Sequence, residues 1–421
     1  MYLKTSSYTE KQLDVLLYLF KVRGATARQI LNGVKGIKNV DRQGTEMKRM
    51  NEMLQRLEKK GAVTSYLTKQ LTGRVHYLTD DGLADIQDLL NISINYQGTG
   101  LNSDFGYFTH SLYSPPKKGI DHFLMQTEVH NIVLNINKLN PGFLDYRDNM
   151  YCVQTFPYKT DDKKLTELKL RPDGEIRINN DIYFIEVDRG TERTEELSLK
   201  FSRYNQYLDY LKSENIESPK GVIFVKENRN PDHARRLVYG NEKRRYTNIR
   251  SIFNKNCKQH ILDFNFLYCE VGKLHDLIIH LSDTSRNKSL AKALDFINEY
   301  NNELTNIRSM SVDEIRLLQV KSAASNDLYI LGEAEGYESK VWSKAFSLFK
   351  QYRKQFDNTF FIAFYNASHS IPAYLPSEVG NLSDTKERDF YTNVFILNIA
   401  GNEPLWFDAT HTVMETAPFS N

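Results

Sequence analysis

Cysteine is scarce in this chain, with only Cys152, Cys257 and Cys269 among 421 residues. Their odd number and wide spacing exclude a disulfide framework and a CxxC metal site, so we expect buried small hydrophobic residues. Long apolar runs are also missing, because no stretch approaches the roughly 18 residues of a membrane span. The first nine residues lack the apolar core of a signal peptide. We therefore predict a cytoplasmic protein that does not contact membranes.

Several catalytic motifs are missing as well. No two of the ten His are separated by a single residue, which argues against the metal site of common rolling-circle initiators and relaxases, although 25 Tyr supply candidate nucleophiles. The absence of a GxxxxGK[ST] loop argues against an ATPase or helicase, and the absence of HExxH argues against a zinc protease. What remains is an ordinary globular composition, with 40% hydrophobic and 26% charged residues.

Positive charge is concentrated at the N-terminus. The whole chain has a net charge of only +2, yet residues 1–79 contain 15 Lys plus Arg against 6 Asp plus Glu. Residues 226–258 are basic too, with 10 Lys plus Arg against 3 Asp plus Glu. Such segments favour polyanionic partners, so the sequence indicates a nucleic-acid-binding N-terminal region.

The N-terminal pattern predicts a winged helix-turn-helix domain over residues 1–92. Apolar periodicity predicts helices over residues 10–21, 26–31, 45–60 and 80–90, and alternation predicts strands over residues 62–67 and 74–79. We expect Gly24 to end the first helix and Gly61 the third. The order of three helices followed by a strand hairpin is typical of this fold.

The third predicted helix carries the candidate DNA-reading face. Its inner stripe is Met47, Met50, Leu54 and Leu57, and the positions off that stripe include Lys48, Arg49, Asn51, Gln55, Arg56 and Lys59. Arg, Asn and Gln read base edges in the major groove, and Lys holds phosphates, as would Lys69 and Arg74 on the hairpin. The alternative is an ordinary solvated helix face. We predict salt-dependent binding to double-stranded DNA, with a homodimer suited to a palindromic site.

The rest of the chain predicts an α/β architecture. Residues 93–120 have no steady periodicity and are interpreted as a linker or irregular crossover. Residues 121–285 predict a core in which a helix over 121–139 leads to a "GFLDYRD" turn region, a strand hairpin, a helix over 195–212 and a strand over 221–227. Residues 286–421 predict a further α/β segment of unknown role, with two helices and three strands.

The stretch "RPDGEIRINNDIYFIEVDRG" raises the question of a metal site. Nucleases of the PD-(D/E)xK type place one acid on a strand, then an acid and a Lys two residues apart on the next. Asp173 and Glu186 match the acids, whereas Asp188 replaces the Lys, so Lys200 is the candidate substitute. The predicted catalytic set is Asp173, Glu186, Asp188 and Lys200, and the predicted Mg²⁺ ligands are Glu128, Asp173 and Glu186. The alternative is an ordinary "PDG" turn with acids at a strand end.

The second basic segment is a candidate backbone-gripping surface. Its cationic candidates are Arg235, Arg236, Arg244 and Arg245, and Tyr239 and Tyr246 are interleaved as stacking partners. A solvated helix face is the alternative.

These motifs together resemble the replication-relaxation family of bacterial plasmid and mobile-element proteins. The resemblance covers about residues 10–225 and rests on "RLEKKGAV", "VHYLTDDG", "DHFLMQTEVHNIVL", "LRPDGEI" and "YFIEVDRGTERTEELSLKFSRYNQYL". It implies a DNA-binding protein of replication initiation or mobilisation, working with replication proteins. It also implies that Asp188 is the family's own pattern. Two other functions stay open: an Mg²⁺-dependent DNA endonuclease, and a transcriptional regulator with a non-catalytic nuclease-like domain.

Overall fold

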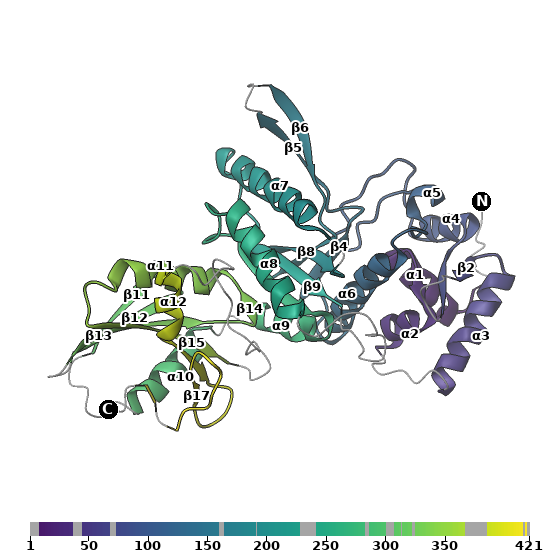
Figure 1. Cartoon of the computed structure of the whole chain (residues 1–421). Coiled ribbons are helices and arrows are strands. Elements are labelled where there is room, and N and C mark those ends of the chain that lie inside the picture. The colour runs from purple at the N-terminus through teal and green to yellow at the C-terminus, as the bar shows by residue number, and fades with distance from the viewer. Residues whose placement is uncertain are drawn as a thin grey trace. The chain divides into compact units, whose positions relative to one another are not determined.

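The computed structural model describes residues 8–36, 44–67, 73–159, 164–190, 192–227, 241–282, 286–299, 307–312, 314–321, 325–366, 385–415 and 417–418. The chain divides into two compact units. The first comprises residues 1–154 and 171–189, and the second comprises residues 155–170 and 190–421. The fold is a mixture of helices with several sheets (Figure 1).

The first unit begins with a helical group that carries a small sheet. Its elements are α1 (Glu10–Val22), β1 (Ala25–Thr26), α2 (Ala27–Lys35), α3 (Thr45–Lys59), β2 (Val63–Leu67), β3 (Arg74–Leu78) and α4 (Asp80–Leu89). The strands form an antiparallel sheet in the order β1-β3-β2. One apolar core joins the helices, with Leu16, Ile30, Leu54 and Ile86 buried in it. The predicted helices and strands of this region are confirmed.

Details at the helix ends differ from prediction. Arg23, not Gly24, takes the left-handed conformation that ends α1, with a φ of 65°. Its guanidinium contacts described below hold it there. Gly61 does follow α3 as expected, with a φ of 74°. Leu90 was expected to face inward but is 38% exposed, because α4 ends one residue earlier.

In the remainder of the first unit, a long helix packs against three strands of a six-stranded sheet. After α5 (His110–Tyr113) come α6 (Ile120–Leu139), β4 (Leu144–Asp148), β7 (Gly174–Ile178) and β8 (Asp181–Asp188). β7 pairs antiparallel with both β4 and β8, and α6 packs on β4 and β8. The predicted hairpin is confirmed. The prediction of a turn region at "GFLDYRD" is wrong. Leu144 and Tyr146 alternate inward there, and residues 144–148 form an edge strand.

The second unit begins with an aromatic α/β core. Its elements are β5 (Gln154–Lys159), β6 (Leu165–Leu170), α7 (Thr194–Ser213), β9 (Gly221–Lys226), α8 (Asn241–Asn256), β10 (Asn265–Glu270), η3 (Val271–Lys273), α9 (Leu274–Ser282) and β14 (Tyr337–Glu338). β9 and β10 are parallel, and β14 pairs antiparallel with β10. The rings of Phe201, Phe224, Phe253 and Phe266 pack together between α7, α8 and these strands. β5 and β6 form a two-stranded ribbon.

The C-terminal segment is a three-layer α/β arrangement. It contains α10 (Arg286–Glu299), β11 (Ile307–Val312), β12 (Ile315–Lys321), β13 (Asn326–Glu333), α11 (Lys340–Tyr352), β15 (Asn358–Tyr365), α12 (Thr385–Thr392), β16 (Val394–Asn398) and β17 (Leu405–Phe407). The sheet order is β11-β12-β13-β15-β16-β17. Apolar clusters on opposite faces of the sheet join it to α11 and α12 on one side and to α10 on the other. The sequence predicted both long helices and the last three strands but missed β11 to β13.

Two compositional predictions can be compared with the structure. Within the described ranges, no helix combines the length and apolar character that crossing a membrane requires. Cys152 and Cys257 are buried as expected, whereas Cys269 is only half-buried. Burial raises the pKa of the Cys152 thiol well above its usual range, with the nearby Asp148 adding to the effect. These cysteines therefore serve packing rather than nucleophilic chemistry.

Candidate functional site

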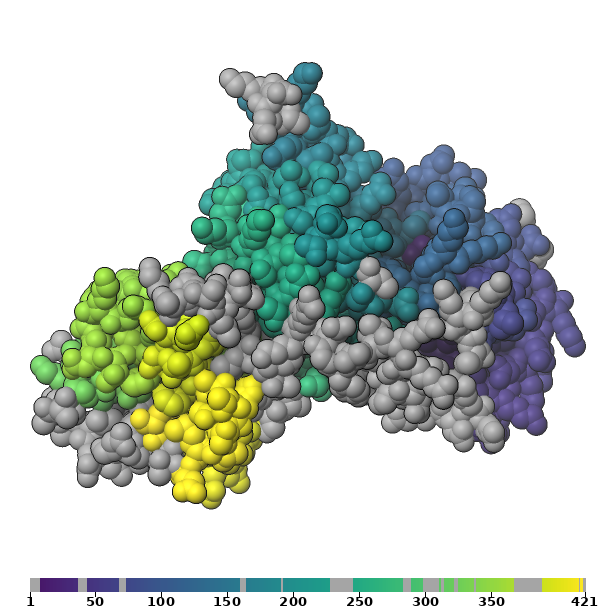
Figure 2. Space-filling model, in the orientation of Figure 1, coloured from purple at the N-terminus to yellow at the C-terminus, as the bar shows by residue number. Residues whose placement is uncertain are grey.

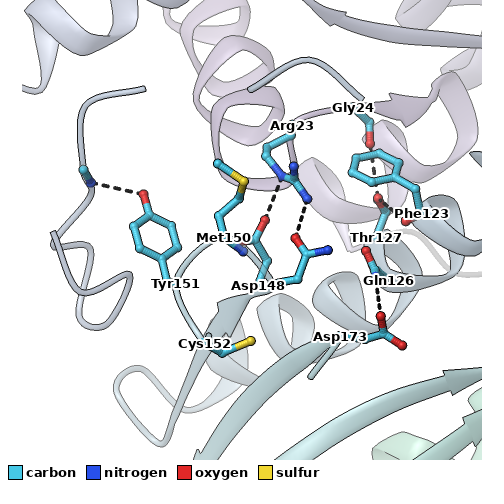
Figure 3. Close-up of polar contacts among 12 residues, drawn as sticks. Arg23, Gly24, Phe123, Gln126, Thr127, Asp148, Met150, Tyr151, Cys152 and Asp173 are labelled. Carbon is cyan, nitrogen blue, oxygen red and sulfur yellow. Dashed lines mark hydrogen bonds and ion pairs between the residues drawn. The ribbon is translucent and has the colours of Figure 1, made fainter. Parts of the chain in front are cut away.

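Asp173 lies at the centre of a dense hydrogen-bond network in the first unit. Its backbone N–H donates to the Ile185 carbonyl at 3.0 Å, which anchors the turn before β7 against β8. Its Oδ1 lies 2.9 Å from His122 Nε2 and accepts from Gln126 Nε2 at 2.7 Å. Its Oδ2 accepts from the Val187 N–H at 2.9 Å. Figure 3 shows the bond from Gln126. Both carboxylate oxygens are therefore occupied by protein donors.

The two side-chain donors come from one face of α6. His122 and Gln126 are four residues apart, so they lie one above the other on the helix. The His122 side chain is 37% exposed and that of Asp173 is 16% exposed, so solvent reaches this pair. Sequence reasoning noted His122 only as part of a motif and missed Gln126. The signal for both was their spacing of four residues, which puts two polar side chains on one face of a helix.

Glu186 and Asp188 lie next to Asp173 on β8. Alternation along the strand puts both side chains on one face, and they are 1% and 3% exposed. The β7–β8 register pairs Gly174 with Ile185, and its continuation sets Asp173 opposite Glu186. Within the first unit, the strand register therefore brings together Asp173, Glu186 and Asp188 of the predicted catalytic set. Close by, Arg189 Nη1 lies 3.3 Å from Asp121 Oδ2.

The other two predicted residues, Glu128 and Lys200, each have a polar partner outside the predicted set. The Glu128 carboxylate accepts from Gln29 Nε2 at 3.4 Å, and Glu128 is two residues beyond Gln126, on the opposite side of α6. Burial raises the pKa of Glu128, an effect that its bond to Gln29 partly offsets. Lys200 belongs to the second unit, where its Nζ lies 2.7 Å from Glu192 Oε1. Among the residues that the structure describes, no three His, Cys, Asp or Glu side chains are arranged to hold a metal ion.

The predicted DNA-reading face of α3 is open to solvent. Met50, Leu54 and Leu57 are buried, whereas the side chains predicted to read DNA are all exposed: Lys48, Arg49, Asn51, Gln55, Arg56 and Lys59. Figure 2 shows α3, in purple, at the surface of its unit. Arg74 is exposed on β3 and its Nε donates to Ser65 Oγ at 2.8 Å. Lys69 lies outside the described residues.

The second basic segment gives a different result. Arg245 Nη1 donates to the Glu192 carbonyl at 2.8 Å, and Tyr246 is fully buried against Phe266 and Tyr268. The predicted stacking role of Tyr246 is therefore wrong, because its ring belongs to the core of the unit. Arg235 and Arg236 lie outside the described residues, as does the side chain of Arg244.

A further polar junction joins the end of α1 to β4. The buried Arg23 donates from Nε to Asp148 Oδ2 and from Nη2 to Asn149 Oδ1, both at 2.8 Å (Figure 3). Its guanidinium also lies 5.1 Å from the centroid of the Phe123 ring on α6. A buried Arg at a helix end carries no distinctive sequence signal, and sequence reasoning missed it.

The fold and the acidic site can now be compared with known proteins. Residues 16–220 match the replication-relaxation family. This match ends within the second unit and includes α3, α6 and the Asp173 network. Among curated proteins, none matches the sequence.

One solved structure also shows similarity. The crystal structure of protein VC1899 from Vibrio cholerae is 15% identical, with a TM-score of 0.24, over 65% of this chain and 57% of that one. The chain thus spans little more than half the length of that protein.

Proposed function

We propose that this protein is a sequence-specific DNA-binding protein of plasmid or mobile-element replication, and that the helical group from α1 to α4 is a winged helix. In this proposal α3 enters the major groove and the β2–β3 hairpin contacts the backbone. The observation that carries it is the division of α3 into a buried apolar stripe and an exposed face of Arg, Lys, Asn and Gln. The replication-relaxation match supports the biological role.

The cations of α3 outnumber its acids, with Lys48, Arg49, Arg56 and Lys59 against Glu46, Glu52 and Glu58. Glu46 accepts from Arg49 at 2.8 Å and also pairs with Lys35, and these cations lower its pKa. Glu58 Oε1 accepts from Ser65 Oγ at 2.5 Å, toward the hairpin. Lys48, Arg56 and Lys59 are exposed on the helix outside the Glu46 pair. A positive surface of this kind attracts DNA phosphates.

A second candidate function is metal-dependent DNA cleavage in a nuclease-like core. The adjacency of Asp173, Glu186 and Asp188 favours it, because clustered carboxylates are the ligands that Mg²⁺ prefers. A bound Mg²⁺ would polarise a phosphate or activate a water molecule. Two observations weigh against cleavage. Both oxygens of Asp173 already accept hydrogen bonds, and Glu128 lies on the side of α6 opposite Gln126, where it contacts Gln29. DNA binding is therefore the primary proposal, with cleavage as its alternative.

DNA binding is tested by fluorescence anisotropy on duplexes that flank the protein's own gene. We expect tight binding to one fragment that weakens steeply with salt. Asn51→Ala should reduce the preference for that fragment over unrelated DNA, and Lys59→Ala should weaken binding to both. Lys212→Ala, an exposed cation on α7, is the matched control and should change nothing. Equal, weak binding to every fragment by the wild type would contradict the proposal.

Cleavage is tested on supercoiled DNA with Mg²⁺, Mn²⁺ or a chelator, beside the Glu186→Ala variant. Metal-dependent nicking that the variant loses would establish the second function. Site-specific binding without nicking in any metal would contradict cleavage. DNA binding would then rest on α3, and Asp173, Glu186 and Asp188 would have a structural role.

A further inference from the structure

We propose that α6 couples DNA binding at α3 to the hydrogen bonding of Asp173. This inference rests on the proposed DNA-binding function and extends it to the acidic network. α6 contacts the helical group along one side and the Asp173 network along another, and all these elements belong to the first unit. A rigid helix with two such faces carries displacement from one to the other.

The side of α6 that contacts the helical group makes a row of hydrogen bonds to it, through Thr127, Asn131 and Asn135, which we call the polar seam. Tyr18 of α1 donates its hydroxyl to Asn131 Oδ1 at 2.8 Å, and Asn131 Nδ2 donates to the Gln29 carbonyl of α2 at 3.1 Å. Asn131 is 0% exposed, so both of its bonds are made away from water. Burial raises the pKa of the Tyr18 hydroxyl, which stays protonated and a donor. Bonds of this kind fix orientation as well as distance, so the seam holds α6 in register with α1 and α2.

Three more bonds extend the seam along α6. Thr127 Oγ1 lies 3.2 Å from the Gly24 carbonyl (Figure 3), Gln29 Nε2 donates to the Leu124 carbonyl at 2.7 Å, and Asn135 Nδ2 donates to Asn32 Oδ1 at 2.9 Å. Residues 127, 131 and 135 are spaced four apart and line one stripe of the helix. A polar stripe on a buried interface sets a unique alignment, whereas an apolar one tolerates sliding.

The path from α3 to this seam is short. α3 packs on α2, and Met50 and Leu54 share the apolar core with Ile30 and Leu31. α2 supplies Gln29 and Asn32 to the seam. DNA held by the exposed face of α3 therefore restrains α2, and through the seam it restrains α6.

The path from the seam to the acidic network is shorter still. Gln126 precedes Thr127 directly, and His122 lies one turn before Gln126. A shift or stiffening of α6 therefore changes how these two donors hold Asp173 Oδ1. The other oxygen of Asp173 holds the Val187 N–H. The exchange rate of the Val187 amide hydrogen thus reports on the state of the Asp173 carboxylate.

The test is hydrogen–deuterium exchange of the full chain, free and saturated with the DNA fragment selected by anisotropy. Peptides that cover α3 report binding, and peptides that cover residues 184–189 report the Asp173 network. We expect DNA to slow exchange at Val187 about fivefold or more, within the usual range of coupling between sites. Tyr18→Phe and Thr127→Val, which each remove a seam bond with little change of shape, should reduce that effect while DNA still binds.

The matched control is Tyr8→Phe. It removes a hydrogen bond from the Tyr8 hydroxyl, just before α1, to Asp85 of α4 at 2.8 Å and leaves the seam intact, so this variant should keep the wild-type response. Slower exchange at α3 with no change at residues 184–189 would overturn the coupling and leave the proposed DNA-binding function standing. An equal response at Val187 in wild type and both seam variants would also overturn it. Failure to bind any DNA would overturn both proposals.

Discussion

The exposed face of α3 and the acidic network around Asp173 use charge in opposite ways. On α3 the cations extend into solvent, and those that pair do so with a neighbouring acid at the surface, such as Glu46. In the acidic network Glu186 and Asp188 are buried, and both oxygens of Asp173 are already bonded to donors of the protein itself. A partner can therefore bind the exposed face of α3 by breaking surface ion pairs at most, whereas any ligand of Asp173 must replace hydrogen bonds that the protein already makes. The first region suits a polyanionic partner, whereas the hydrogen bonds of the second region hold β7, β8 and α6 together.

The largest expected effect comes from breaking a buried charge pair between β4 and β7, two residues along the chain from Asp173. Arg147 Nη2 donates to Glu175 Oε2 at 2.6 Å, and Glu175 is 1% exposed. Arg147→Met leaves this buried carboxylate with only Arg177, at 3.3 Å. We expect the free energy of unfolding to fall by about 3 kcal/mol. Arg49→Met, on the exposed face, should change it by no more than about 0.5 kcal/mol. Urea denaturation measures the free energy of unfolding of both variants. Similar losses in Arg147→Met and Arg49→Met would contradict the contrast between buried and exposed charges.

The next effect lies in the first region and concerns affinity rather than stability. Arg56 is exposed on α3, one turn before Lys60 at the end of the helix. If it pairs with a guanine, Arg56→Ala should cost about 1–3 kcal/mol of binding free energy for the specific site and little for unrelated DNA. Anisotropy titrations on both duplexes measure the difference. A uniform loss on both would assign Arg56 to the phosphate backbone instead.

These two regions were not equally predictable from the sequence. The face of α3 follows from periodicity, because the apolar stripe Met50, Leu54 and Leu57 fixes which residues remain outside. The hairpin that holds Asp173, Glu186 and Asp188 follows from alternation and a "PDG" turn. The partners of Asp173 do not, since only folding brings residues 122 and 126 to residue 173. Glu128 shows the same limit, because its place in a motif did not reveal the side of α6 on which it lies.

Acid should lower the stability of the protein through the buried His130 of α6. Burial, with Lys21 and Arg23 adding to it, lowers the pKa of His130 on α6 to about 3. The unfolded imidazole has a pKa of about 6.5, so between these values the unfolded state binds more protons, and stability present above pH 6.5 is lost as the pH falls toward 3. At pH 5 we expect a loss of about 1–2 kcal/mol.

The measurement is thermal or urea unfolding of the wild type and of His130→Phe at several pH values. Phe keeps the ring contact with Tyr146, whose centroid lies 4.7 Å away, and removes the titration. The variant should lose less stability between pH 7 and pH 5, while His275→Gln, a partly exposed control, should follow the wild type. Parallel curves for all three proteins would assign the acid sensitivity to other groups.

The smallest effect tests whether the bonds to Asp173 compete with a metal ion. Gln126 donates to Asp173 Oδ1 at 2.7 Å, a position that a cation would need. Gln126→Ala removes this competitor and should improve Mn²⁺ or Mg²⁺ binding by about 1 kcal/mol, the net value of a single hydrogen bond, seen as a larger rise in Tm on adding the ion. Gln126→Ala combined with Glu186→Ala should cancel the gain if Glu186 is a ligand. A rise in Tm that is the same in wild type and Gln126→Ala would show that the ion binds elsewhere, and Asp173 would then be a purely structural acid whose oxygens were never available.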